Sequence, residues 1–159
     1  MYPIVLLVIV LCAALIHIFF YKRGRDNRKV VEIFLFYFLV IFVGVSGILG
    51  FIGHTFAPDR IARMIGWPLG SPFQFEVAIA NLAFGILGIL CLWIRGNFWV
   101  AVALGSSIFS LGAATGHIRE MISKQNFAIY NIGPVLFVND ILVPIVILSL
   151  VVAYKLTQK

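Results

Sequence analysis

Two histidines and two carboxylates stand at the ends of long apolar runs in this sequence. Their ionisable side chains could bind a ligand or a metal ion, or transfer protons. His54 and His117 each follow an apolar run, and Glu76 and Asp140 each lie near the beginning of the next run. Ionisable side chains at membrane depth are costly, so they usually face a protein interior and pair with one another. We therefore expect a shared polar site. The same pattern also fits side chains that only pair structurally or anchor helix ends at the membrane surface.

Three kinds of chemistry could use these residues. Two histidines and two carboxylates could ligate a transition metal, because imidazole suits zinc, iron or copper and carboxylates add charge. His117 and Glu120 also stand three residues apart, which is the His/Glu spacing of helical metal sites. The two histidines could instead hold a haem axially or border a quinone site. Third, the residues could relay protons or bind a small solute.

No H-E-x-x-H or CxxC motif accompanies these residues. The sequence therefore names no reaction, and whether the protein is an enzyme stays open. Neighbouring polar residues extend the predicted ligand-binding site, which comprises His54, Gln74, Glu76, His117, Asp140, Arg60, Arg63 and Glu120. The predicted metal ligands within it are His54, Glu76, His117 and Asp140.

The composition indicates where these residues must be held. Of the 159 residues, 62% are hydrophobic and 11% are charged, and the mean hydropathy is +1.09. Soluble domains are about 45–50% apolar and about 25% charged. The chain is therefore predicted to be an integral membrane protein whose first partner is the lipid bilayer. Five of its basic residues form one cluster within 22–29, directly after an apolar run, which is typical of a membrane-flanking loop and not of a nucleic-acid interface.

A membrane-spanning helix needs about 20 apolar residues. The sequence predicts an all-α bundle of five such spans in a single transmembrane domain over residues 1–159, at about 3–21, 31–55, 74–94, 98–117 and 134–154. A short amphipathic helix is predicted near 58–65, where it would lie at the membrane interface.

The orientation follows from the distribution of Lys and Arg, which favour cytoplasmic loops. Connection 22–30, the 95–97 turn and the C-terminal tail together hold eight of these residues, and the opposite side holds four. We therefore expect an inner-membrane protein with its N-terminus outside and its C-terminus in the cytoplasm. All residues of the predicted site then lie at the external end of the bundle.

A weak internal repeat relates the two histidines. Each unit runs from an apolar helix through a Gly-His pair and an amphipathic stretch to an Ile-Gly pair, and then enters the next span. Small residues lie four and seven positions before each histidine, on one helical face. Such stripes let helices approach closely in lipid. A tandem repeat of two helices is one interpretation, and chance likeness between apolar segments is the other.

Glycine recurs every three residues at Gly44, Gly47, Gly50 and Gly53. This stripe supports a different class of function, a non-catalytic scaffold or accessory subunit that packs against another membrane protein or a second copy of itself. Packing within the bundle would explain the stripe equally well.

Residues 65–77 read IGWPLGSPFQFEV and are followed by Asn81-Leu82 and Gly85, with His54 and Phe56 upstream. This pattern resembles a domain of unknown function found in small prokaryotic multi-pass membrane proteins. The resemblance covers residues 44–90 and implies a membrane protein without implying a reaction. More loosely, the bundle resembles the DoxX-like membrane proteins, some of which are linked to quinone-dependent redox chemistry.

Overall fold

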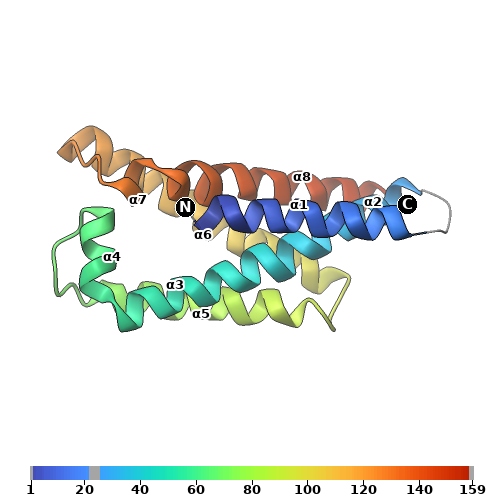
Figure 1. The fold of residues 1–159 in the computed structure, drawn as a ribbon, viewed down its shortest axis with the longest axis horizontal. Helices are drawn as coiled ribbons and strands as arrows, with labels where there is room; N and C mark the ends of the chain where they lie inside the picture. Colours follow the sequence, from blue (N-terminus) through green and yellow to red (C-terminus); the bar gives the residue numbers. More distant parts are fainter. Residues whose placement is uncertain (1, 22–25, 158–159) are drawn as a thin grey trace.

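A computed structural model describes residues 2–21 and 26–157, and all of the regular structure in these residues is helical. The elements, in chain order, are α1 (Tyr2–Phe20), α2 (Asn27–Tyr37), the π-helical η1 (Phe38–Val45), α3 (Ser46–Phe56), α4 (Pro58–Ile65), α5 (Phe73–Leu90), α6 (Asn97–Lys124), α7 (Ile129–Ile132), the π-helical η2 (Val135–Leu142) and α8 (Val143–Leu156). Figure 1 shows these helices arranged along one common long direction, except α4, which crosses it at one end.

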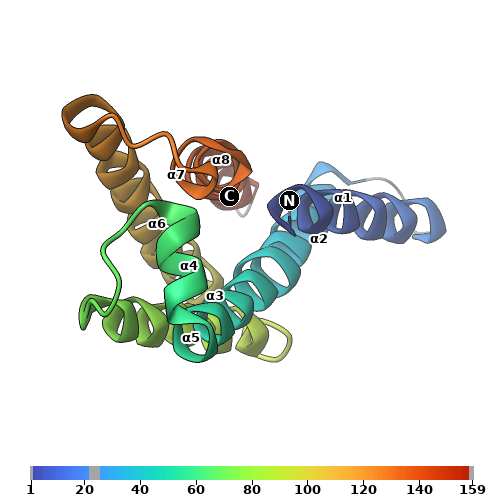
Figure 2. The same ribbon diagram turned by 60° about the vertical axis from the view of Figure 1, so that its left-hand side comes forward.

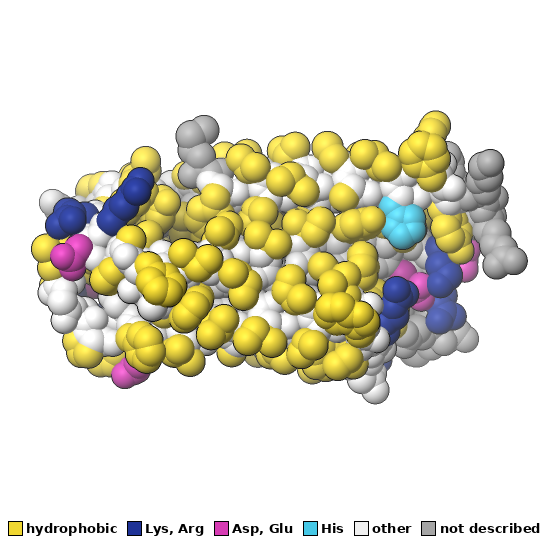
Figure 3. Space-filling model, turned by 60° about the horizontal axis from the view of Figure 1, so that its bottom comes forward, with side chains coloured by type: hydrophobic (Ala, Val, Ile, Leu, Met, Phe, Trp, Pro, Cys, Tyr) yellow, Lys and Arg dark blue, Asp and Glu magenta, His cyan; other side chains and the backbone are white. Residues whose placement is uncertain are grey.

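Five helices in the described residues are long and apolar enough to cross a membrane: Tyr2–Phe20, Asn27–Phe56, Phe73–Leu90, Asn97–Lys124 and Ile129–Leu156. The all-helical class and the five candidate spans are therefore confirmed. Figure 3 shows hydrophobic side chains covering the middle of the visible face, while charged side chains gather toward its two ends. A soluble protein spreads charged side chains over its whole surface, whereas here an apolar band lies between two charged ends. Such a band suits contact with lipid.

Several helices begin or end away from the boundaries of the predicted spans. The fourth helix continues past residue 117 to Lys124, so Arg119 and Glu120 lie on α6 and not in a loop. The third helix ends at Leu90, and the connection to α6 is 91–96, where Gly96 has φ +70°. Hydropathy detects which residues suit lipid, but helix ends are set by backbone geometry and hydrogen bonding, so the two boundaries need not coincide.

Helix α4 occupies Pro58–Ile65, where the amphipathic helix is predicted. It begins with a proline in its first turn and ends at Gly66, whose φ of +83° is the left-handed conformation that glycine adopts without strain. Ala62 and Ile65 are buried on one side, whereas Arg60 is exposed. Figure 2 shows α4 between the α3–α5 pair and the α6–α7 region, and we call this end of the bundle the α4 end.

The α3–α5 crossing depends on the predicted glycine stripe. A Cβ atom at Gly47 would lie 2.6 Å from the backbone oxygen of Asn81 and 2.6 Å from the amide nitrogen of Gly85. A Cβ atom at Gly88 would lie 2.5 Å from the nitrogen of Gly44. Three glycines of the stripe thus lie against α5 and Gly53 lies against Ile61 of α4, so the expected close approach is confirmed for α3 and α5. The surface on which the scaffold hypothesis rested is used within the chain.

Large side chains pack tightly at the end of the bundle opposite α4. Leu35, Leu39, Trp99, Ile147 and Tyr154 are among the buried residues of this core, which joins α2, η1, α6 and α8. The Trp99 Nε1 atom donates to the backbone oxygen of Cys91 at 3.0 Å, which satisfies the one polar atom of this buried indole. Toward the α4 end these helices carry smaller residues, and the packing opens.

The fifth span changes helix type where it carries its acid. Segment η2 holds Asn139 and Asp140, and Pro144 lies in the first turn of α8 directly after it. Proline has no amide hydrogen, so Pro144 cannot donate to the Asp140 carbonyl as an α-helical residue would. The amide of Val143 instead donates to the Val138 carbonyl, five residues back. Such π-helical turns are frequent at functional sites.

Candidate functional site

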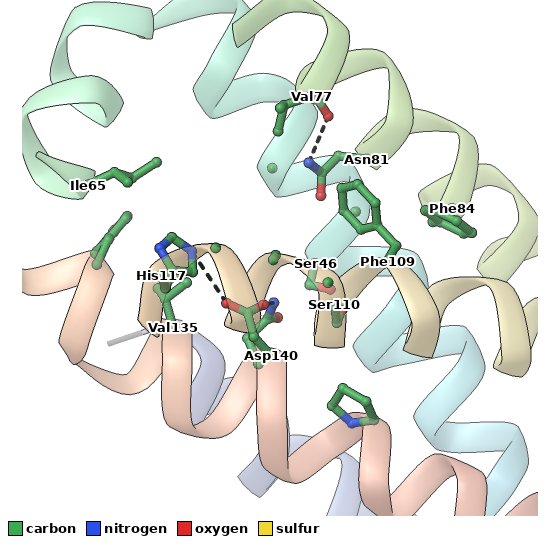
Figure 4. Close-up of a pocket in the computed structure, with 18 of the residues that line it drawn as sticks. Ser46, Ile65, Val77, Asn81, Phe84, Phe109, Ser110, His117, Val135 and Asp140 are labelled. Carbon is green, nitrogen blue, oxygen red and sulfur yellow. Dashed lines mark hydrogen bonds and ion pairs between the residues drawn. The ribbon is translucent and has the colours of Figure 1, made fainter. Parts of the chain in front are cut away.

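A cavity of about 1140 Å³ lies between the α3–α5 pair and the α6–α8 pair. Its walls are mainly apolar and include Phe42, Phe84, Phe109, Val143 and Ile147. Its polar lining residues include Ser46, His54, Asn81, Ser107, Ser110, His117, Glu120, Asn139 and Asp140. Figure 4 shows side chains from α5, α6 and η2 converging on this space.

The cavity exists because α6 presents small residues to its neighbours. Ser106, Ser110 and Ala113 line it, and so do Gly112 and Gly116. A Cβ atom built on Gly112 or Gly116 would meet no atom within 4 Å. The predicted stripe below His117 consists of Ala113, Ser110 and Ser106, which line the cavity, and Gly112 and Gly116 are not part of that stripe. Similar small residues draw α3 against α5 but leave a void beside α6.

His117 is held from one side by a buried amide. Its Nδ1 atom lies 2.7 Å from Asn131 Oδ1, while Asn131 Nδ2 donates to the backbone oxygens of His117 at 3.2 Å and Asn126 at 2.7 Å. Carbonyl oxygens only accept, so these two bonds orient the Asn131 amide with its oxygen toward the ring. His117 Nδ1 therefore carries a hydrogen and donates, and Nε2 is directed toward Asp140.

Asp140 is the most deeply buried acid of the cavity, with its side chain 5% exposed. Its Oδ1 atom accepts from Asn139 Nδ2 at 2.7 Å. Its Oδ2 atom lies 3.7 Å from His117 Nε2 and has no hydrogen-bond partner among the described residues. In Figure 4 the two side chains face each other from α6 and η2. A buried carboxylate oxygen without a donor is costly, so this atom calls for a functional explanation.

His54 is fixed in the same way on the other side of the cavity. Its Nδ1 atom lies 3.1 Å from Gln74 Oε1, and Gln74 Nε2 donates to the backbone oxygen of Pro58 at 2.9 Å. The Pro58 carbonyl sets the orientation of the Gln74 amide, so His54 Nδ1 is also the donor. The centroid of the His54 ring lies 6.3 Å from that of Trp67, which lines the cavity as well.

Comparison with known proteins gives the family. The full length of the chain, residues 1–159, matches DUF6790, a family of unknown function. The chain belongs to this family. The expected membership of an uncharacterised family is thus confirmed. No curated protein and no solved structure matches the chain.

Four of the eight predicted site residues do not line the cavity of this DUF6790 member. Glu76 is exposed on α5, and Arg60 and Arg63 are exposed on α4. Each was placed by its distance from a helix end, which does not determine the direction in which the side chain points. Gln74 is buried behind His54 and acts through it. Glu120 lines the cavity, and its Oε1 atom accepts from Lys124 Nζ at 2.6 Å.

The predicted metal ligands are not brought together. Within residues 2–21 and 26–157, no group of three or more His, Cys, Asp or Glu side chains has a geometry that could hold a metal ion. Of the four predicted ligands, His117 and Asp140 face one another, His54 lies on α3 across the cavity, and Glu76 points away. The DUF6790 chain therefore provides a pair of facing groups where a metal centre was expected.

Sequence reasoning missed the amides that position this DUF6790 site. Asn131 is fully buried although it lies in the predicted 118–133 connection, and Asn126 joins that connection to α4 by donating to the Ile65 carbonyl at 2.9 Å. Asn81 lines the cavity from α5. In the sequence, Asn81 follows the predicted 56–73 connection, and Asn126 and Asn131 lie within the predicted 118–133 connection. Asparagine is so common in and near loops that this position does not identify a functional residue.

Proposed function

We propose that this protein is a membrane protein that binds a lipid-soluble small molecule with an oxygen-bearing head group, as in quinones and quinols. The observation that carries the proposal is the cavity, which has apolar walls and groups its histidines and buried acid at the α4 end. Small-molecule sites have this composition, being largely apolar with a few placed polar groups that orient the ligand.

The dimensions of the cavity favour a molecule with a ring or a chain over a small ion. Ligand pockets are about 300–1,000 Å³, and this cavity of about 1140 Å³ exceeds that range. Phe84 and Phe109 pack with their ring centroids 5.3 Å apart at its apolar side. They offer flat surfaces for a ring or an alkyl chain, while His54, His117 and Asp140 offer hydrogen bonds to a head group.

The cavity reaches the outside of the bundle within its apolar belt. Ile108 lines the cavity although 70% of the residue is exposed, and Gly112 and Gly116 on the same helix are exposed too. A molecule dissolved in the membrane could therefore enter beside α6 without crossing water. This opening supports a lipid-soluble ligand.

The proposal places the protein in the cell's inner membrane, with the α4 end and its polar groups on the external side. The support is the distribution of basic residues, eight on one side and four on the other. Four of the eight, Lys22, Arg23, Arg25 and Lys159, lie outside the described residues. Arg28 and Lys29 both pair with Glu32, at 3.1 and 2.6 Å.

We also propose that segments 46–90 and 97–156 are two copies of one unit. In each, a histidine near the end of a helix donates through Nδ1 to a side-chain amide of the following segment. The amides come from different places in the two units, Gln74 inside α5 and Asn131 inside α7. The acids differ as well, since Glu76 is exposed and Asp140 is buried. Such divergence is expected if only the second unit kept its acid for the ligand.

Fluorescence titration of the purified protein with decylubiquinone tests the proposal, because Trp67 lines the cavity and a bound quinone ring quenches a nearby indole. We expect saturable quenching in the native protein. A Gly112→Phe variant adds a ring to the cavity lining at a position where a Cβ atom meets nothing within 4 Å, so we expect it to fold and to weaken binding by at least about tenfold. The matched control is Leu104→Phe, on a part of α6 that is exposed and does not line the cavity.

The Leu104→Phe control should bind as the native protein does, and Trp67→Phe should remove the saturable signal. Equal quenching of the native, Gly112→Phe and Trp67→Phe proteins would show that the quinone merely partitions into detergent. That outcome, or no quenching at all, would contradict the proposed function.

A further inference from the structure

We infer that the cavity recognises its ligand through a hydroxyl group, whose oxygen sits between His117 Nε2 and Asp140 Oδ2. This inference rests on the proposed function and narrows the ligand class to hydroxyl-bearing molecules such as quinols and alkylphenols. Acceptor-only molecules, such as quinones and aryl ethers, would still enter the cavity but would bind at least about tenfold more weakly than the matching hydroxyl compound.

Two side-chain atoms of the His117–Asp140 pair remain free to bond a ligand. Asn131 uses the Nδ1 hydrogen of His117, and Asn139 uses Oδ1 of Asp140, so the atoms left for a ligand are His117 Nε2 and Asp140 Oδ2. Both residues line the cavity, and the Asp140 side chain is only 5% exposed. Its Oδ2 atom has no partner within the described ranges, so a ligand group would complete its hydrogen bonding.

The distance between His117 Nε2 and Asp140 Oδ2 leaves room for one oxygen atom. The two free atoms are 3.7 Å apart, which is too far for a direct hydrogen bond. An oxygen atom placed about 2.8 Å from both would complete two hydrogen bonds of ordinary length. The separation therefore leaves the direct hydrogen bond unmade and admits one oxygen atom within hydrogen-bond distance of both groups.

The number of protons on the His117–Asp140 pair determines which of its free atoms donates and which accepts. Net charge is costly to bury at membrane depth. The pair carries no net charge when one proton resides on either Nε2 or Oδ2, in addition to the hydrogen on Nδ1. One of the two free atoms is then a donor and the other an acceptor. A hydroxyl group accepts from the first and donates to the second, which satisfies both.

A carbonyl or ether oxygen lacks a hydrogen and can only accept. It would pair with the donor atom and leave the acceptor atom buried without a partner. Sites built to bond a hydroxyl reject analogues that cannot supply the bond, because the unpaired group retains its desolvation cost. The pair thus selects for the hydroxyl.

The test compares 4-decylphenol with 4-decylanisole, which share the ring and the tail and differ in the hydroxyl hydrogen. Calorimetric titration of the native protein in lipid nanodiscs should show the phenol binding at least about tenfold more tightly. Asp140→Leu should abolish this preference while anisole affinity changes little. The control carboxylate variant is Glu76→Gln, whose residue is exposed and does not line the cavity, and it should keep the full preference.

Equal affinities for the two compounds in the native protein would overturn the hydroxyl inference and leave the proposed function standing. Binding of neither compound, together with no saturable quinone quenching, would overturn both. A phenol preference that survives in Asp140→Leu would overturn the assignment to this pair.

A second measurement keeps the inference testable if Asp140→Leu does not fold. In the native protein labelled with nitrogen-15 histidine, both ring-nitrogen resonances of His117 disappear in His117→Gln, and Nε2 is the one coupled through two bonds to both carbon-bound ring hydrogens. Adding 4-decylphenol should shift this resonance, and 4-decylanisole should not. Equal shifts, or none with a phenol that calorimetry shows to be bound, would overturn the inference.

Discussion

At the scale of single residues, two buried amides organise the candidate site. Gln74 and Asn131 each fix one histidine through Nδ1, and each is itself oriented by a backbone carbonyl. Both imidazoles therefore carry their hydrogen on the side away from the cavity. The chemistry available to a ligand is set by residues that do not touch it, and this is why Gln74 belongs to the site although it does not line the cavity.

Replacing Asn131 by leucine tests this positioning role. The leucine is of similar size but makes none of the three hydrogen bonds of Asn131, so the Asn126 carbonyl and the His117 ring Nδ1 lose their partner, while the His117 carbonyl keeps its helical bond within α6. Each buried group left unpaired costs about 1–3 kcal/mol, so the free energy of unfolding should fall by at least about 2 kcal/mol. Denaturant unfolding followed by circular dichroism measures the change.

The control for this variant is Thr115→Val on α6. Thr115 is exposed, and its Oγ1 atom bonds only to the Leu111 carbonyl, so the change should stay within about 0.5 kcal/mol of the native protein. An Asn131→Leu protein as stable as this control would show that the amide does not hold the histidine.

At the scale of helices, the same kind of residue serves two purposes. Glycines on η1 and α3 lie against α5 with no room for a side chain, whereas Gly112 and Gly116 on α6 face open space. The sequence shows glycines in both places. What differs is the partner: α5 supplies Gly85 and Gly88 opposite the first stripe, whereas Phe84 and Phe109 take up space beside α6 and keep it apart.

Alanine substitutions distinguish a glycine that allows close helix packing from a glycine that faces open space. At Gly47 a Cβ atom would lie 2.6 Å from backbone atoms of Asn81 and Gly85, and overpacking of this kind costs about 1–3 kcal/mol. At Gly112 the Cβ atom meets nothing, and alanine favours the helix by up to about 1 kcal/mol. We therefore expect Gly47→Ala to be clearly less stable than Gly112→Ala in thermal unfolding. Equal stability of the two variants would refute the account of the α3–α5 crossing.

Hydropathy and helix-breaking residues were enough to predict the five long helices and α4, because apolar length and the Pro58 and Gly66 signals act locally. The sequence also predicted that His54, His117 and Asp140 share one region, since all three lie near the same ends of their helices. It did not predict that Glu76 points outward, because that depends on how α5 is rotated against α3. The buried role of Asn131 depends on tertiary contacts that no local pattern encodes.

At the scale of the whole molecule, the bundle is divided along its length. Large side chains such as Trp99 and Leu39 close the end opposite α4, and small residues with α4 above them leave the other end open around the cavity. Figure 2 shows how α4 joins the two halves there, and the Asn126 bond to the Ile65 carbonyl secures that junction.

The most direct test of the central claim is native mass spectrometry of the protein released from its own membranes. We expect the native protein and Leu104→Phe to carry one lipid-soluble molecule per chain, and Gly112→Phe to have lost it, since only the last change fills the cavity. Fragmentation of the released molecule should show a hydroxyl-bearing head. The same bound species on all three proteins, or none on the native protein, would contradict the claim that this cavity is a binding site.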